Sequence, residues 1–226
     1  MNLEAHYKNL YEESIQKISN DDYQIDDLIH SPLDNRFGIT LLARPSKKVK
    51  NEIQKFLSKL KTIEPNQYYY ANSDIHITVM SIISCYDGFM LKDIELPEYI
   101  KHINDSLIDD SNIEIKFKGI TASPSCVMIQ GFMNNESLNK IRNKLRDNFK
   151  NSTLEQSIDK RYAIQTAHAT VVRFTENLSK KSDFLNLIEN HKDHNFGSFK
   201  IKTLELVYND WYQKQKHVKN LFSFNL

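Results

Sequence analysis

Residues 76–79 (HITV) and residues 168–171 (HATV) carry the same pattern, His-x-Thr-Val, 92 positions apart. Both lie in runs rich in β-branched and apolar residues, IHITVMSIIS at 75–84 and AHATVVRF at 167–174, a composition typical of β-strands. Side chains alternate between the faces of a strand, so the histidine and threonine of each motif share one face. The sequence therefore predicts two strands that each bury an apolar face and present an imidazole beside a hydroxyl.

The segments around these two strands follow a similar order twice, with a strand and a helix before each motif and a helix after it. The predicted elements are helices at 3–18, 47–63, 96–107, 138–149 and 184–188, strands at 37–43, 75–84, 167–174, 199–208 and 218–224, and a hairpin of 113–120 with 126–132. In the helix at 138–149 the lysines and arginines are predicted to face outward. The pattern predicts a protein built from both helices and strands.

The composition is that of an ordinary globular protein with balanced charge. Its 226 residues are 40% hydrophobic, which is enough to bury a core, and a formal net charge of +1 argues against a protein that coats a polyanion. Cys85 and Cys126 stand alone in apolar stretches, so we expect buried thiols rather than a disulfide framework or a zinc site. The N-terminus lacks an apolar signal sequence and no run approaches a membrane span, so we expect a cytoplasmic protein.

Two histidines beside two threonines suit the chemistry of a phosphodiester. Its cleavage needs a base for the attacking oxygen and an acid for the leaving oxygen, and histidine takes either role because its ordinary pKa is about 6.5. Threonine hydroxyls can donate hydrogen bonds to the non-bridging oxygens. A single histidine in an apolar strand is more often a packed core residue. The second matched copy is what favours a reaction centre at His76, His168, Thr78 and Thr170.

These paired motifs resemble the two H-x-T-hydrophobic motifs of the 2H phosphoesterase superfamily, which includes 2′-5′ RNA ligase and cyclic phosphodiesterase proteins. The resemblance covers residues 37–224. It implies a bilobal α+β fold, with two pseudo-symmetric antiparallel sheets flanked by helices around a central groove, in residues 37–226. Residues 1–36 are then a helical N-terminal extension. By this resemblance His76 and His168 are the acid and the base, in either order, and Thr78 and Thr170 hold the phosphate.

The function implied by the resemblance is hydrolysis of a 2′,3′-cyclic phosphate, a cyclic nucleotide or a short oligonucleotide, without a metal or other cofactor. The expected partner is a nucleotide or RNA-end phosphodiester, with no membrane, and a monomer is expected. Two alternatives stay open: a nucleotide or RNA-end binding module with little or no turnover, and a metal hydrolase. The segment HKDH at 191–194 has no third ligand nearby in sequence, which favours a solvated loop.

Four further side chains are candidates for substrate binding. Arg173 could pair with phosphate, as in similar H-x-T-x-x-R arrangements, but strict alternation turns it away from His168 unless the strand twists or bulges. Arg44 could do the same, or remain at an exposed strand end. Tyr70 and Trp211, the only tryptophan, could stack on a base or pack against a sheet.

Overall fold

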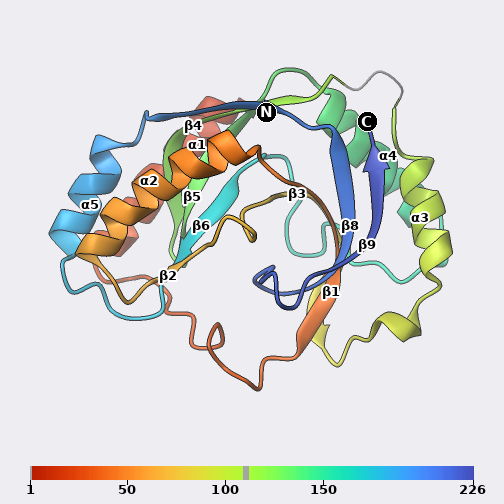
Figure 1. Ribbon diagram of the computed structural model, residues 1–226, viewed down its shortest axis with the longest axis horizontal. Helices are drawn as coiled ribbons and strands as arrows, with labels where there is room; N and C mark the ends of the chain where they lie inside the picture. The colour runs from red at the N-terminus through yellow and green to blue at the C-terminus, as the bar shows by residue number, and fades with distance from the viewer. Residues whose placement is uncertain (1, 109–111) are drawn as a thin grey trace.

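The computed structural model describes residues 2–108 and 112–226, which form two antiparallel sheets. The first sheet has, in spatial order, β3 (Ile77–Asp87), β1 (Arg36–Ala43), β8 (Thr203–Asp210) and β9 (Lys219–Asn225). The second has β2 (Tyr68–Tyr69), β6 (Ala169–Arg173), β5 (Cys126–Met133), β4 (Glu114–Ser123) and β7 (Asn195–Lys200). One histidine motif leads into each sheet, and the sheets lie side by side (Figure 1). This confirms the predicted α+β fold with two antiparallel sheets.

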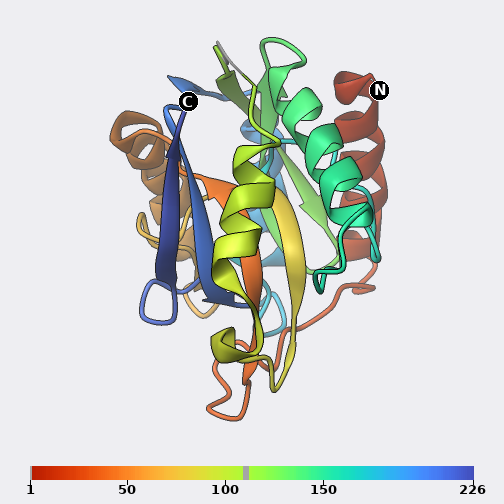
Figure 2. The same ribbon diagram turned by 90° about the vertical axis from the view of Figure 1, so that its right-hand side faces the viewer.

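Helices flank the two sheets at both ends of the molecule (Figure 1). They are α1 (Leu3–Ser19), α2 (Lys47–Ile63), α3 (Leu96–Asn104), α4 (Ser137–Lys150) and α5 (Lys181–Asn190), with a short 3₁₀ helix η1 (Leu91–Asp93) before α3. Two of these helices cross between the lobes: α2 follows β1 but packs on β7, and α4 follows β5 but packs on β3. Figure 2 shows α3 and α4 side by side against the sheet that holds β3 and β1. This exchange ties the two lobes together.

The segments whose apolar residues recur at helical spacing form the predicted helices. In α2 the buried residues recur at helical spacing, and the Ser46 hydroxyl accepts a hydrogen bond from the Val49 N–H at 3.4 Å, which caps the first turn. Pro97 lies in the first turn of α3, where its missing N–H costs nothing. Within the described ranges, no helix is both long and apolar enough to cross a bilayer.

The strand predicted at 199–208 is wrong in one respect. It is two strands, because β7 ends at Lys200 in the five-stranded sheet and β8 begins at Thr203 in the four-stranded sheet. Residues 201 and 202 carry the chain from one sheet to the other. The apolar pattern continues through this passage because Ile201 is itself buried, 5% exposed, between the lobes.

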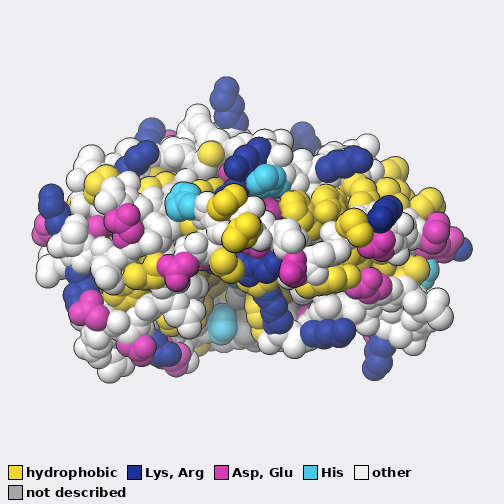
Figure 3. Space-filling model, turned by 90° about the horizontal axis from the view of Figure 1, so that it is seen from below, with side chains coloured by type: hydrophobic (Ala, Val, Ile, Leu, Met, Phe, Trp, Pro, Cys, Tyr) yellow, Lys and Arg dark blue, Asp and Glu magenta, His cyan; other side chains and the backbone are white. Residues whose placement is uncertain are grey.

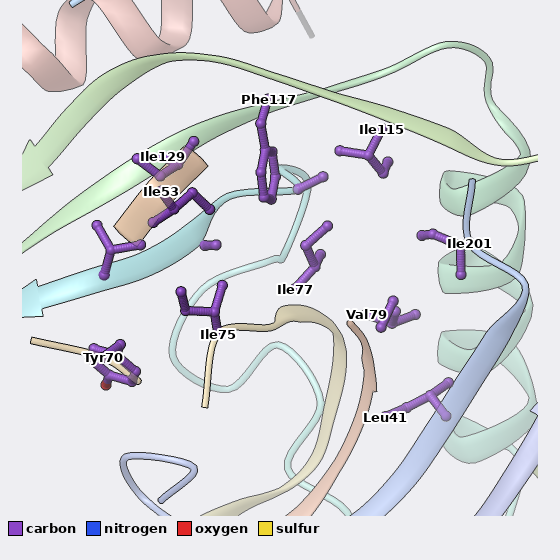
Figure 4. Packing of buried hydrophobic residues seen from close by; sticks show 14 of the residues in the cluster. Leu41, Ile53, Tyr70, Ile75, Ile77, Val79, Ile115, Phe117, Ile129 and Ile201 are labelled. Carbon is purple, nitrogen blue, oxygen red and sulfur yellow. The ribbon is translucent and has the colours of Figure 1, made fainter. Parts of the chain in front are cut away.

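The core fills the space between the sheets and beneath the helices. Figure 4 shows Ile75, Ile77 and Val79 among Phe117 and Leu41, which come from different sheets. The apolar face of the first motif strand therefore packs into the joint between the lobes, as alternation predicts. This burial, at 0% exposure for Ile77 and Val79, leaves the opposite face for His76 and Thr78.

The N-terminal segment before β1 packs closely on the five-stranded sheet. Tyr7, Ser14 and Ile18 of α1 are buried against it, and the Ser14 hydroxyl donates to the Ala122 carbonyl at 2.8 Å. The Tyr7 hydroxyl donates to the carbonyl of Gly131 and accepts from its N–H, both at 3.2 Å. Helix α1 thus contacts the backbone of β4 and β5 directly.

Candidate active site

The two histidines line one groove between the sheets. Each stands one residue before its strand, His76 before β3 and His168 before β6, rather than within the strand as predicted. Both side chains are half-buried. The groove is lined by Thr40, Tyr70, His76, Thr78, Met80, Ser81, Ser84, Cys85, Ser157, Asp159, Arg161, Tyr162, Ile164, His168, Thr170, Arg173, Asn209, Trp211, Tyr212 and Gln213.

The valine that ends the first motif is the extra residue of a β-bulge. Thr78 pairs with Leu42 of β1 and Met80 pairs with Leu41, so Val79 has no partner of its own. A bulge bends its strand, increases the local twist and leaves backbone groups outside the ladder. The backbone carbonyls of Thr78 and Val79 therefore need hydrogen-bond donors from outside the sheet.

The second motif has a bulge at the equivalent valine. On β6 the register with β5 slips between Val172 and Thr170, so Val171 is the extra residue. The bulge shifts the alternation of side chains by one position, and Arg173 consequently lines the groove together with His168. The two motifs are thus similar in backbone as well as in sequence.

The two imidazoles have different partners at Nδ1, although both partners lie two residues earlier. Nδ1 of His76 is 2.7 Å from the Asp74 carbonyl oxygen, which can only accept, so the neutral ring carries its proton on Nδ1 and a lone pair on Nε2. Nδ1 of His168 is 2.7 Å from the Thr166 hydroxyl, which can donate or accept. The neutral His168 ring can therefore keep its proton on Nε2. His76 is prepared to accept a proton at Nε2, and His168, once it is protonated on both nitrogens with the Thr166 hydroxyl as acceptor at Nδ1, can donate one from Nε2.

Burial lowers the pKa of both histidines to about 4 from the ordinary 6.5. The positive charges of Arg44 and Arg173 act in the same direction on the pKa of His76, and those of His76 and Arg142 on the pKa of His168. Both rings are therefore neutral at pH 7 in the free protein. A bound phosphate anion would raise both pKa values, because it stabilises the charged imidazolium.

NMR titration of the free protein should show the His76 and His168 rings taking up protons near pH 4. Inorganic phosphate should raise both midpoints. Because the unfolded chain binds these protons at about pH 6.5, the free energy of unfolding should fall as the pH drops from about 6.5 to about 4. A variant with glutamine at both positions should lose less stability over this range. Ring midpoints near 6.5 without phosphate would contradict this account.

Arg173 is held in place by groups from three parts of the chain. Its Nε donates to the Tyr70 hydroxyl at 3.0 Å, Nη1 is 3.5 Å from Asp26 Oδ2, and the guanidinium lies 5.4 Å from the Tyr212 ring centre. Burial opposes the charge of Arg173, but Tyr70, Cys126 and Asp26 outweigh it and raise the pKa of the guanidinium. Asp26 lies between α1 and β1, in a stretch to which the sequence pattern assigned no site residue.

Arg44 and Tyr70 lie where their predicted roles are difficult to fulfil. Arg44 is outside the groove lining, because its Nε donates to Glu205 at 2.8 Å and its Nη1 to the Ser73 carbonyl at 2.6 Å. Tyr70 is only 2% exposed, so its ring faces are covered and only its hydroxyl acts, on Arg173. We therefore leave Arg44 out of the proposed site and treat Tyr70 as a support for Arg173.

Trp211 lines the groove with its ring beside two guanidinium groups. The Arg161 guanidinium lies 3.9 Å from the ring centre and that of Arg36 4.8 Å. Such contacts are favourable because the ring face is electron-rich, and a base can stack on the same kind of surface. Positive, negative and apolar side chains are interspersed over the face seen in Figure 3, in agreement with the balanced total charge.

Several residues around the groove were missed or placed differently by the sequence pattern. Cys85 is half-buried and lines the groove, whereas Cys126 is buried as expected. Arg142 of α4 points inward, so the prediction that the arginines of this helix face outward is wrong for this one. Among the residues that the structure describes, no three histidines, cysteines or carboxylates gather as metal ligands, and His191 instead lies 3.4 Å from the Lys59 ammonium.

Several solved structures have a similar fold, and each aligns with this chain over nearly its whole length. Escherichia coli LigT in complex with 3′-AMP has a TM-score of 0.57 at 13% identity, covering 84% of this chain and 98% of LigT. A crystal structure described as a phosphoesterase has a TM-score of 0.56 at 12% identity, covering 84% and 98%. A conserved protein of unknown function from Agrobacterium tumefaciens has a TM-score of 0.52 at 12% identity, covering 93% and 98%. At these identities the likeness concerns the fold alone.

A search of curated proteins finds no match to this sequence. The model of one protein family, the AKAP7 2′5′ RNA ligase-like domain, matches residues 39–219. This range contains both histidine motifs, most of β1, the strands from β2 to β8 and the helices from α2 to α5. The chain therefore belongs to the AKAP7 2′5′ RNA ligase-like domain family, within the 2H phosphoesterase superfamily.

Proposed function

We propose that this protein hydrolyses a phosphodiester of a nucleotide or RNA end, such as a 2′,3′-cyclic phosphate, by acid-base catalysis with His76 and His168 and without a metal. The observation that carries the proposal is the convergence of both motifs in one groove, each with its threonine beside its histidine. Two imidazoles on opposite walls can serve the attacking and the leaving oxygen of a single phosphorus.

Thr78, Thr170 and Arg173 are proposed to bind the non-bridging oxygens of the phosphate. All three line the groove with the histidines, and the threonines occupy equivalent positions in the two motifs. Hydroxyl and guanidinium donors gain strength as negative charge builds up on these oxygens in the transition state. Because Arg173 is fixed by Tyr70 and Asp26, its donors are already oriented before a substrate binds.

The different Nδ1 partners support an assignment of roles, with His76 as the base and His168 as the acid. Nε2 of His76 takes a proton from water as the water oxygen forms its bond to phosphorus. The bound phosphate anion stabilises the imidazolium form of His168, and as the bond from phosphorus to the leaving oxygen breaks, Nε2 of this imidazolium gives that oxygen a proton and the ring becomes neutral. The products are a phosphomonoester and a free hydroxyl. Exchange of protons with water restores both rings.

Trp211 is proposed as the surface for the nucleobase. LigT has been solved with 3′-AMP, with ATP and with NADP+, which share a nucleotide. In the present chain the indole ring lies in the same groove as the histidines, and Arg161 already stacks on it. A base stacked on Trp211 would place the attached ribose phosphate toward the motifs.

A screen in the presence of EDTA tests the reaction class directly. The purified protein would be offered 2′,3′-cyclic nucleotides, 3′,5′-cyclic nucleotides, cyclic dinucleotides and 2′-5′ linked oligonucleotides. We expect product from at least one of these substrate classes, at the same rate with EDTA as without it. Turnover that EDTA abolishes would favour a metal hydrolase. Tight binding in calorimetry without product from any class would favour a binding module.

A further inference from the structure

Arg142 is a fully buried charged residue that the chemistry described above does not use. It lies on the inner face of α4 at 0% exposure, among the apolar residues that this helix buries. Arginine is almost never fully buried unless its charge is paired. Within the described part of the chain, no carboxylate forms an ion pair with Arg142, so its retention needs another explanation.

The guanidinium donates to backbone carbonyls of the first histidine motif and of Thr166, two residues before the second motif. Nε donates to the Val79 carbonyl at 3.1 Å, and Nη2 donates to the Thr78 carbonyl at 3.1 Å and to the Thr166 carbonyl at 2.7 Å. Nη1 reaches the Asn139 side chain on its own helix at 3.4 Å. Burial lowers the pKa of Arg142 to about 10, so the group stays charged at neutral pH. A single planar group therefore bridges the two lobes.

The three carbonyls lie beside the groups of the proposed site: two are in the strand that carries Thr78, and the third belongs to the residue that contacts His168. β3 is an edge strand of its sheet, and the bulge at Val79 leaves the carbonyls of Thr78 and Val79 to be satisfied from outside the ladder. Thr166 is the residue whose hydroxyl contacts His168. Arg142 thus fixes the position of Thr78 on one side and the support of His168 on the other.

We propose that Arg142 is a positioning residue, which sets the separation of the two histidine motifs by binding the carbonyls of Thr78, Val79 and Thr166 with one guanidinium. This role rests on the proposed function, because the acid and the base must face the same phosphorus from opposite sides. A fixed fork of donors suits the task better than a flexible ammonium, since its geometry is rigid. An error of about 1 Å in such a separation can lower the rate about 10²-fold.

The test compares Arg142→Lys and Arg142→Met with the unsubstituted protein, using folded material confirmed by thermal unfolding. Both variants should lower kcat about 10- to 100-fold with a smaller change in KM, because the geometry of the transition state suffers more than binding. Arg142→Met should also raise the pKa of His168, since a positive charge is lost, whereas Arg142→Lys should not. A third variant, Arg142→Ala, leaves a space for a free guanidinium ion, so guanidinium chloride at millimolar concentration should restore part of its kcat.

Lys144→Met is the matched control, because Lys144 is exposed on the same helix and, among the described residues, donates to the Leu107 carbonyl at 3.1 Å and to no group of either motif. A wild-type kcat in folded Arg142→Lys would overturn the proposal, and this variant decides alone if Arg142→Met proves too unstable. If the unsubstituted protein turned over no substrate, the proposed function would fail instead. The His168 titration and the affinity for inorganic phosphate would then still test Arg142, and neither should change in Lys144→Met.

Discussion

His76→Ala and His168→Ala should each lower the hydrolysis of a nucleoside 2′,3′-cyclic phosphate by about 10²- to 10⁴-fold. Each variant removes one of the two proton transfers, and neither remaining imidazole can serve both sides of the phosphorus. The loss should appear in kcat, measured by single-turnover kinetics, because the threonines and Arg173 that bind the phosphate remain. Affinity for inorganic phosphate should change much less.

The two losses should differ with the leaving group, which tests the assignment of roles. A p-nitrophenyl phosphodiester of a nucleoside has a leaving oxygen that departs without protonation. His168→Ala should therefore recover much of its rate on this substrate, whereas His76→Ala should remain slow because the water still needs a base. The reverse order would exchange the roles of the two histidines.

An exposed histidine provides the control for these variants. His194→Ala should retain the rate of the unsubstituted protein, because His194 lies outside the groove lining, in the turn before β7. If His76→Ala and His168→Ala kept full activity across the whole panel of cyclic phosphates, the two motifs would not be a reaction centre. Thermal unfolding of each variant shows whether a lost rate reflects chemistry or lost structure.

The sequence predicts the fold well wherever one face of an element is buried. The helix at 47–63 and the hairpin at 113–132 could be located because their apolar spacing is dictated by a single core face. The split between β7 and β8 could not, since Ile201 is buried like Phe199 and Leu204 in the two strands, and no glycine or proline marks the crossing. Periodicity reports burial, and burial is continuous where a chain passes between two sheets that share a core.

The site is less predictable than the fold because much of it depends on backbone irregularities and long-range contacts. The motif residues follow from local alternation, but the position of Arg173 depends on the bulge at Val171, which has no sequence signature here. Asp26 reaches Arg173 from a segment without periodicity. Arg142 is one of several basic residues on its helix, and only its position on the apolar stripe distinguished it in the sequence.

Gly131→Ala should both destabilise the protein and displace His168, because there is no room for a methyl group at this position. A Cβ added to Gly131 would lie 1.9 Å from the carbonyl oxygen of Ala167 and 3.1 Å from the Phe117 ring. The first neighbour is backbone, and it belongs to the residue just before His168. We expect the free energy of unfolding in urea to fall by about 3 kcal/mol, the upper part of the usual range for overpacking.

The effect on the site separates this prediction from an ordinary loss of stability. Ala167 has to move away from the new methyl group, so the ring of His168 should shift in NMR spectra of the folded variant and kcat should fall. Gly88→Ala is the matched control: its φ of 83° strains any other residue, but nothing lies within 4 Å of the added Cβ. That variant should lose about 1 kcal/mol and keep the rate, since strain alone is local. A Gly131→Ala variant as stable and as active as the unsubstituted protein would show that the close approach of β5 to the segment before His168 is not needed.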